Sequence, residues 1–163
     1  MIRGIHHISI STRDMDRIVS FYRDLLGCPT VIDASVAEDE SFDRVVGLSN
    51  SRARAVFLQA GNAFIEFWEY ASPQGKDPIP NRPVCDAGLT HICFDVEDAR
   101  SVHARLSSAG VPFVSEPQDL GSVITCYARD PDGNILEIRQ GKNPTGVLEI
   151  TPDIIASAKS NRG

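Results

Sequence analysis

Two histidines and two glutamates occur where apolar side chains predominate. His7 and His91 stand in the stretches GIHHISI and GLTHICF, and Glu66 and Glu137 stand in FIEFW and ILEI. A buried, unpaired carboxylate is costly, so its place in such a stretch needs an explanation. Two imidazoles and two carboxylates suit a divalent first-row metal ion, and the two negative charges balance its charge. The four residues therefore predict one bound metal ion, with Ni, Co, Zn, Mn and Fe all left open.

The same pattern occurs twice along the chain. GIHHISI at residues 4–10 is echoed by GLTHICF at 88–94, and GNAFIEF at 61–67 is echoed by the shorter GNILEI at 133–138. A lone His or Glu in a strand is more often a structural or solvated residue. That interpretation does not require the same two residue types to recur at equivalent places, so the repeat favours metal ligands.

Each half of the chain reads as a strand, a helix and further strands. The histidine stretches alternate as strands do, and helical patterns follow at 15–26 and 99–109, each ending at a glycine with a proline two residues later. Further strands are predicted at 54–60 and 123–129, before the glutamate strands. The sequence therefore predicts an α+β fold of two tandem βαβββ modules.

The module boundaries follow from the same patterns. Module 1 covers about residues 2–70 and module 2 about 87–140, in a single domain at 1–141, with a Pro-rich linker at 71–86. The segment 33–51 is expected to be one strand and a loop that covers the site. The tail, 142–163, is expected to carry a short helix with Thr151 as its N-cap and Pro152 in its first turn.

The period of two along a strand gives each candidate ligand its direction. Ile65 and Phe67 are expected to face the helix, so Glu66 faces the other way, and the same holds for the other three ligands. Residues that share the ligand face by this alternation are predicted to line a substrate cavity: Ser9, Phe64, Trp68, Cys93, Ile135 and Arg139.

Both histidine strands, a helix that ends in LLG at 25–27 and the motif DPDGN-x-LE at 130–137 resemble the vicinal oxygen chelate superfamily. This group contains glyoxalases, bleomycin-resistance proteins and extradiol dioxygenases, and the resemblance covers roughly residues 2–140. It implies paired βαβββ modules that form a U-shaped mixed β-sheet around the metal. The order His, Glu, His, Glu is that of metal-dependent glyoxalase I. Methylmalonyl-CoA epimerases are similar but carry Gln in place of Glu66.

The resemblance implies a metal-dependent lyase or isomerase, similar to glyoxalase I or to an epimerase. Four protein ligands leave two positions of an octahedral ion for vicinal oxygens of a small hydroxycarbonyl-type substrate. Chelation would lower the pKa of the adjacent C–H and stabilise the enediolate. By analogy with glyoxalase I, Glu137 is the expected catalytic base and Glu66 its partner on the opposite face of the substrate, and the exchanged assignment stays open.

Three alternatives stay open. A non-haem iron ring-cleaving dioxygenase would use two His and one carboxylate, and Glu66 would then occupy the place that dioxygen needs. A non-catalytic binding or resistance protein usually lacks the ligands altogether. A thiol transferase of the fosfomycin-resistance type normally has one carboxylate rather than two. The sequence also leaves open whether glutathione or a CoA thioester is involved, because no convincing set of Arg and Asn aligns as a glutathione site.

Composition excludes several partners. A net charge of −6, with scattered basic residues, argues against nucleic acid, and no apolar run is long enough to cross a membrane. No signal peptide is recognised. The remaining histidines, His6 and His103, are expected to be surface or structural residues. We expect free, buried thiols at all four cysteines, Cys28, Cys85, Cys93 and Cys126. Such cysteines predict a cytoplasmic location for the protein. A homodimer is a further expectation.

Overall fold

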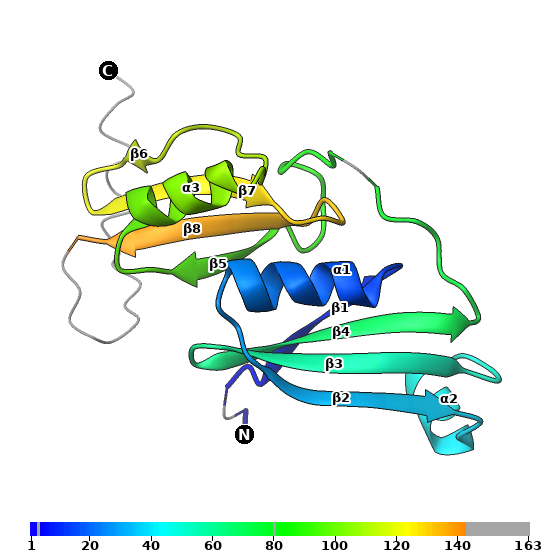
Figure 1. The fold of residues 1–163 in the computed structure, drawn as a ribbon. Coiled ribbons are helices and arrows are strands. Elements are labelled where there is room, and N and C mark those ends of the chain that lie inside the picture. Colours follow the sequence, from blue (N-terminus) through cyan, green and yellow to red (C-terminus); the bar gives the residue numbers. More distant parts are fainter. Residues whose placement is uncertain (3, 80, 143–163) are drawn as a thin grey trace. The chain divides into compact units, whose positions relative to one another are not determined.

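The computed structural model describes residues 1–2, 4–79 and 81–142, so the helix predicted near Thr151 lies outside the described residues. The chain divides into two compact units, Met1–Pro80 and Asn81–Gly163 (Figure 1). The division falls inside the Pro-rich stretch at 71–86, although β4 already occupies its first two residues. The predicted single-domain organisation stays a prediction.

Unit 1 is built on a four-stranded mixed sheet with the strand order β1-β4-β3-β2. The parallel pair joins β1 to β4, and the other pairs are antiparallel. A parallel neighbour requires a crossover connection, which the helices and β2 and β3 provide. The strands are β1 (His7–Thr12), β2 (Thr30–Ala37), β3 (Arg52–Ala60) and β4 (Ala63–Ser72).

The helix predicted at 15–26 is two elements, α1 (Met15–Ser20) and the π-helix η1 (Phe21–Leu25). The side chain of Asp14 accepts a hydrogen bond from Arg17 N and so caps α1. The buried face packs against β3 and β4, where the rings of Tyr22 and Phe67 lie 4.8 Å apart. This contact fixes which face of the sheet is the core.

A short helix, α2 (Glu40–Val46), occupies part of the segment that was expected to be a loop. Its Asp39 cap accepts hydrogen bonds from Ser41 N at 2.8 Å and Phe42 N at 3.0 Å, and Gly47 ends it at φ 69°. None of its residues is buried, so it has no apolar stripe by which a sequence pattern could reveal it. The prediction of one strand in this segment is confirmed by β2.

Unit 2 repeats the plan with the order β5-β8-β7-β6, and again only β5 and β8 among its pairs are parallel. Asp98 caps α3, which packs on β7 and β8. Leu106, Leu136 and Ile138 are completely buried. The elements are β5 (His91–Asp95), α3 (Ala99–Ser108), β6 (Gln118–Asp119), β7 (Val123–Arg129) and β8 (Ile135–Gly141). The predicted α+β class, with mixed four-stranded sheets, is thus confirmed.

All four cysteines are free, but only Cys28 and Cys126 are buried. The expectation of burial is wrong for Cys85, which lies in a turn before β5, and for Cys93, which alternation places on the face of β5 away from α3. In the described part of the chain, no helix is long and apolar enough to span a membrane.

Candidate metal centre

In unit 1, the candidate ligands lie on the parallel neighbours β1 and β4. Glu66 is paired in register with Ser9, and His7 with Phe64. His7 Nε2 lies 3.5 Å from Glu66 Oε2. Glu66 is 7% exposed, so the carboxylate of this imidazole–carboxylate pair is buried.

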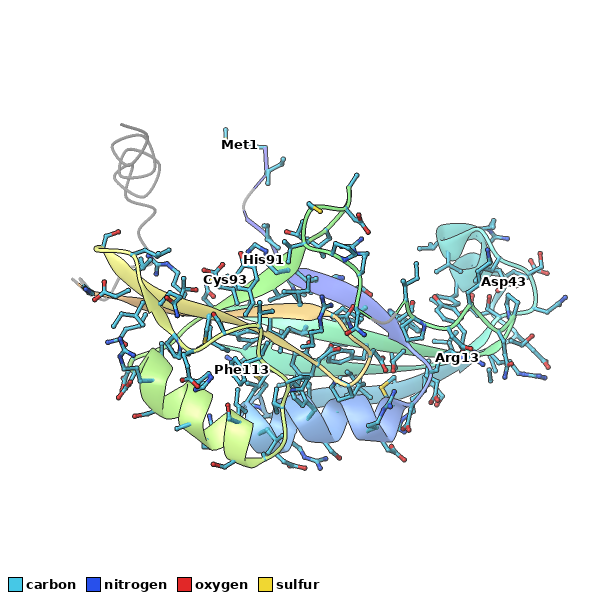
Figure 2. All side chains as sticks on the ribbon, turned by 90° about the horizontal axis from the view of Figure 1, so that it is seen from above. Met1, Arg13, Asp43, His91, Cys93 and Phe113 are labelled. Atoms are coloured by element: carbon cyan, nitrogen blue, oxygen red, sulfur yellow. The ribbon has the colours of Figure 1, made fainter. Side chains whose placement is uncertain are left out.

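The pair recurs in unit 2, on the parallel neighbours β5 and β8. His91 Nε2 lies 3.1 Å from Glu137 Oε2, and Glu137 is paired in register with Cys93. In both sheets, therefore, the residue that pairs with the glutamate lies on the histidine strand, two positions after the histidine. Figure 2 shows His91 and Cys93 on the same strand. Two independent sheets thus build the same imidazole–carboxylate pair at equivalent positions.

The other ring nitrogen of each histidine is bound by the preceding residue. His7 Nδ1 lies 2.8 Å from His6 Nδ1, and His91 Nδ1 lies 3.0 Å from Thr90 Oγ1. A metal-binding histidine usually donates its second N–H to such a partner, which fixes the ring orientation and leaves Nε2 for the metal. The arrangement therefore presents both Nε2 atoms beside a carboxylate oxygen.

The donor separations fit a metal ion. Two ligands bound at right angles, each at about 2.1 Å, are about 3 Å apart, and the two observed N–O separations, 3.5 and 3.1 Å, are close to this value. Across the residues that the structure describes, no group of three or more His, Cys, Asp or Glu could hold a metal ion. Each unit offers two donors, and a four-ligand site would need the pairs from both units.

The surroundings of the two glutamates differ. Thr125 Oγ1 on β7 donates a 2.7 Å hydrogen bond to Glu137 Oε1. Thr125 is paired in register with the residue that stands two positions after Glu137. The residue at the equivalent position beside Glu66 is Ala55, which has no hydroxyl. The sequence-based prediction missed Thr125, because only the histidine and glutamate strands were searched for residues on the ligand face. The same alternation along β7 identifies it.

An aromatic residue lies opposite each glutamate. Phe57 pairs with Glu66 and its ring lies 5.5 Å from that of His7, while Tyr127 pairs with Glu137 and its ring lies 5.2 Å from that of His91. Partial burial, together with the Glu137 carboxylate, raises the pKa of Tyr127, so its hydroxyl is protonated at neutral pH.

Three of the predicted substrate-binding residues belong to unit 1. Ser9 lies beside Glu66 in register, and the ring of Phe64 is 5.4 Å from that of His6. Trp68 is stacked between Phe42 of α2, at 5.0 Å, and Tyr70, at 5.8 Å. Helix α2 therefore covers Trp68. Tyr70 shares the face of Glu66 by alternation and was missed by the sequence-based prediction.

The other three belong to unit 2. Partial burial of the thiol, together with the neighbouring Glu137, raises the pKa of Cys93 to about 12. Ile135 is 4% exposed. Arg139 Nη1 donates to Asp95 Oδ1 at 2.6 Å, so this cation is already paired. The substrate contacts of all six residues stay predictions.

The remaining histidines have different surroundings. His6 is exposed and is the hydrogen-bond partner of His7. His103 is 9% exposed, its ring lies 4.3 Å from that of Phe113, and its Nδ1 is 3.4 Å from Glu116. It therefore lies on the buried face of α3 as a structural residue.

The family model of the Glyoxalase/Bleomycin resistance protein/Dioxygenase superfamily matches residues 4–138. The chain belongs to this superfamily. It is 27% identical over 143 residues to mitochondrial methylmalonyl-CoA epimerase of Mus musculus, covering 83% of this chain and 72% of that protein. It is 25% identical over 148 residues to the metallothiol transferase FosB of Shouchella clausii (86% and 82%). It is 26% identical over 145 residues to lactoylglutathione lyase of Schizosaccharomyces pombe (82% and 46%).

Solved structures of superfamily members share the fold. A glyoxalase family protein from Bacillus cereus superimposes with a TM-score of 0.79 at 25% identity, covering 88% of this chain and 97% of that one. The fosfomycin resistance protein FosX of Listeria monocytogenes, crystallised with Mn(II) and a sulfate ion, gives a TM-score of 0.59 at 17% identity (87% and 95%). These structures show the shared fold, and the curated relatives named above support an enzyme of the superfamily without specifying its reaction.

Proposed function

We propose that the chain is a metal-dependent lyase or isomerase that removes a proton next to the carbonyl of a small hydroxycarbonyl-type substrate. One divalent ion, among Ni, Co, Zn, Mn and Fe, would be held by His7, Glu66, His91 and Glu137. The observation that carries the proposal is the repeated pair, in which a histidine Nε2 faces a glutamate oxygen in both sheets. Two carboxylates in the set balance the ion's charge.

The protein groups have distinct roles in this proposal. A divalent ion at these donors would polarise the substrate carbonyl and make the neighbouring C–H more acidic. Glu137 accepts that proton as the principal base, and Thr125 orients its carboxylate. Glu66 stands on the other face of the substrate. By accepting the Nδ1–H of His7 and of His91, His6 and Thr90 would hold the two imidazoles in the tautomer that leaves Nε2 free of a proton.

The named relatives support this class and define the compounds to test. Methylmalonyl-CoA epimerase and lactoylglutathione lyase are names of isomerase and lyase activities, and FosX was crystallised with a divalent metal ion. A substrate panel therefore contains hemithioacetals, 2-hydroxy ketones, acyl-CoA thioesters and small polyols. A cytoplasmic location and a homodimer belong to the proposal as well, the latter to be checked by the mass in solution.

Metal analysis of the purified chain tests the ligand set. We expect one divalent ion per chain in the wild type, loss of the ion and of activity in His91→Ala, and retention of both in the control His103→Gln, a substitution on the buried face of α3. An ion that stays fully bound in His91→Ala contradicts the proposed ligand set.

The reaction class has its own test. Proton abstraction predicts turnover without oxygen and incorporation of deuterium from D₂O at the carbon that loses its proton. Turnover that stops when O₂ is removed would instead identify the ring-cleaving dioxygenase.

A further inference from the structure

Arg129, the last residue of β7, lies in one row with the first residues of both ligand strands of unit 2. His91 on β5 is paired in register with Ile135 on β8, and Ile135 is paired with Arg129. Figure 1 shows the three strands side by side in this order. Residues paired in register project from the same side of a sheet, so Arg129 shares the face of the candidate ligands. Two strand spacings of about 4.8 Å separate its backbone from that of His91 by roughly 10 Å.

The half-buried guanidinium of Arg129 joins the two segments that lead into these strands. Its Nη1 donates a 2.8 Å hydrogen bond to Gly133 O, in the turn before β8. Its Nη2 donates a 2.8 Å hydrogen bond to Arg82 O, in the segment before β5. Hydrogen bonds from a charged donor are stronger than those from a neutral one. Arg129 therefore ties the start of the His91 strand to the start of the Glu137 strand.

The contacts continue from Arg82 to the ring of His91. Arg82 Nη2 donates a hydrogen bond to the carbonyl of Leu89. Arg82 Nη1 lies 3.3 Å from the place that a Cβ would take at Gly88, so the guanidinium lies directly against this segment. The residue after Leu89 is Thr90, whose Oγ1 is 3.0 Å from His91 Nδ1. A continuous series of hydrogen bonds and peptide bonds thus connects the Arg129 side chain to the imidazole of His91.

Unit 1 provides an internal comparison, because Gln59 stands at the equivalent place on β3. Gln59 N donates to Pro29 O at 2.9 Å, and Arg129 N donates to Pro112 O at 3.0 Å in the same way. The side chain of Gln59 makes a 3.4 Å contact with Gly61 O, which lies in its own turn and not in the segment before β1. The link between the two ligand strands that Arg129 makes in unit 2 is therefore not repeated by Gln59.

We propose that Arg129 is a positioning residue of the candidate metal centre, which acts through Arg82 and holds the imidazole of His91 beside Glu137 before any ion binds. The inference rests on the proposed function for its purpose, whereas the positioning itself is a property of the metal-free chain. Donors that are already in place need no reordering when an ion binds, so the affinity for the ion should depend on Arg129.

The chain has four histidines, so labelling with ¹³Cε1-histidine gives four imidazole signals in an NMR spectrum of the full-length, chelator-treated protein. Single His→Gln substitutions assign them. Arg129→Gln removes the charged donor, Arg129→Lys keeps the charge, and Arg82→Gln removes the bond to the Leu89 carbonyl. Gln59→Ala, at the equivalent position of unit 1, is the matched control. Urea unfolding of each variant measures its stability separately.

We expect the His91 signal to shift, and its ring to become more mobile on the nanosecond timescale, in Arg129→Gln and in Arg82→Gln. The signals of His7 and His103 should stay in place, Arg129→Lys should lie between wild type and Arg129→Gln, and Gln59→Ala should leave all four signals unchanged. In a titration with Mn(II), the Kd of Arg129→Gln should rise about tenfold, the lower end of what the loss of an outer partner of a metal ligand costs.

Two results would overturn the proposal. A His91 signal with wild-type position and mobility in both Arg129→Gln and Arg82→Gln, whatever their stability, would make Arg129 a structural residue only. Equal changes at all four histidines would mean a general loosening of the fold. If Arg129→Gln does not fold, Arg82→Gln and Arg129→Lys decide by the same signals. A wild-type chain that binds no Mn(II) would contradict the proposed function, and the metal-free spectra would still decide whether Arg129 positions His91.

Discussion

Thr125 Oγ1 donates a 2.7 Å hydrogen bond to Glu137 Oε1, whereas the equivalent neighbour of Glu66 is Ala55. The two carboxylates that the repeat makes equivalent are therefore held differently. A carboxylate that accepts a hydroxyl hydrogen bond is restricted in orientation, and such second partners tune a metal ligand. Of the two glutamates, Glu137 is thus the one whose position the surrounding sheet specifies through a side-chain hydroxyl.

Replacement of this hydroxyl should weaken the site. We expect Thr125→Val, which keeps the side-chain shape, to reduce metal affinity or activity by about 10- to 100-fold, as loss of a hydrogen-bond partner of a metal ligand typically does. Thr125→Ser keeps the hydroxyl and should retain most of both. Metal competition with a chelator and steady-state rates measure the two effects. Wild-type affinity and rate in Thr125→Val would show that Glu137 needs no such partner.

The Nδ1 partners of the two histidines can be tested in the same way. His6→Ala and Thr90→Val each remove the group next to an imidazole Nδ1, and each should lower metal affinity by about 10- to 100-fold without unfolding the chain. Both residues precede their histidine directly, so the effects should be similar in size. The far-UV circular dichroism of each variant serves as the folding control. Unchanged chelator competition in both variants would mean that the imidazoles are oriented by their strands alone.

Much of the fold could be predicted because the repeat and the strand period are strong local signals. Alternation around Glu66 and Glu137 correctly gave the core face of β4 and β8, where Phe67 and Ile138 are buried. Helix α2 could not be predicted, since none of its residues is buried and its stacking contact, Phe42 on Trp68, depends on the folded chain. Alternation along β7 would have placed Thr125 on the ligand face, but its contact with Glu137 depends on strand register, which is a long-range property.

Long-range contacts also determine which charged side chains are paired, and the sequence pattern does not show them. The sequence placed Arg139 among the residues that line the substrate cavity, but its guanidinium is paired with Asp95, which is 44 residues away along the chain. No spacing rule predicts that pair. Arg13 and Lys76, in contrast, are 63 residues apart and line one cavity, because β1 and β4 are parallel neighbours. Sheet pairing, which local pattern does not supply, therefore determines which cations are accessible.

The cap of α3 predicts a pH dependence of stability. Hydrogen bonds from Ser101 and Arg100 hold the pKa of Asp98 below its ordinary value. The unfolded state then binds the proton more readily than the folded state does. The stabilisation that the ionised Asp98 cap contributes is therefore complete above the ordinary carboxyl pKa of about 3.9, and it is lost as the pH falls through the lower pKa of the folded state. Urea unfolding of wild type and Asp98→Asn should therefore differ in pH dependence below about pH 4.

The control for this cap is Asp95, which is exposed on β5 and caps no helix. Asp95→Asn should leave the acid-dependent contribution of Asp98 in place. Identical curves for Asp98→Asn and the wild type between neutral pH and acid would mean that the cap contributes nothing that depends on its charge.

The two glutamates are separated by matched amide substitutions. Glu66→Gln and Glu137→Gln each keep an oxygen donor and remove a base, so both should retain metal. If Glu137 is the principal base, Glu137→Gln should lose about 10²- to 10⁴-fold in rate, the usual cost of losing general-base catalysis, and Glu66→Gln should lose less. Rates are compared only for protein with measured metal content, because loss of the ion imitates loss of the base.

The pattern of the two rates decides the mechanism. Exchange of substrate protons with D₂O, measured beside turnover, shows whether a slow variant fails at proton removal or at a later step. A greater loss in Glu66→Gln, with metal retained, would reverse the roles, and would mean that the carboxylate without a hydroxyl partner is the one that moves to the substrate. Equal and severe losses, again with metal retained, would indicate that one carboxylate removes the proton and the other returns it, as an epimerisation requires.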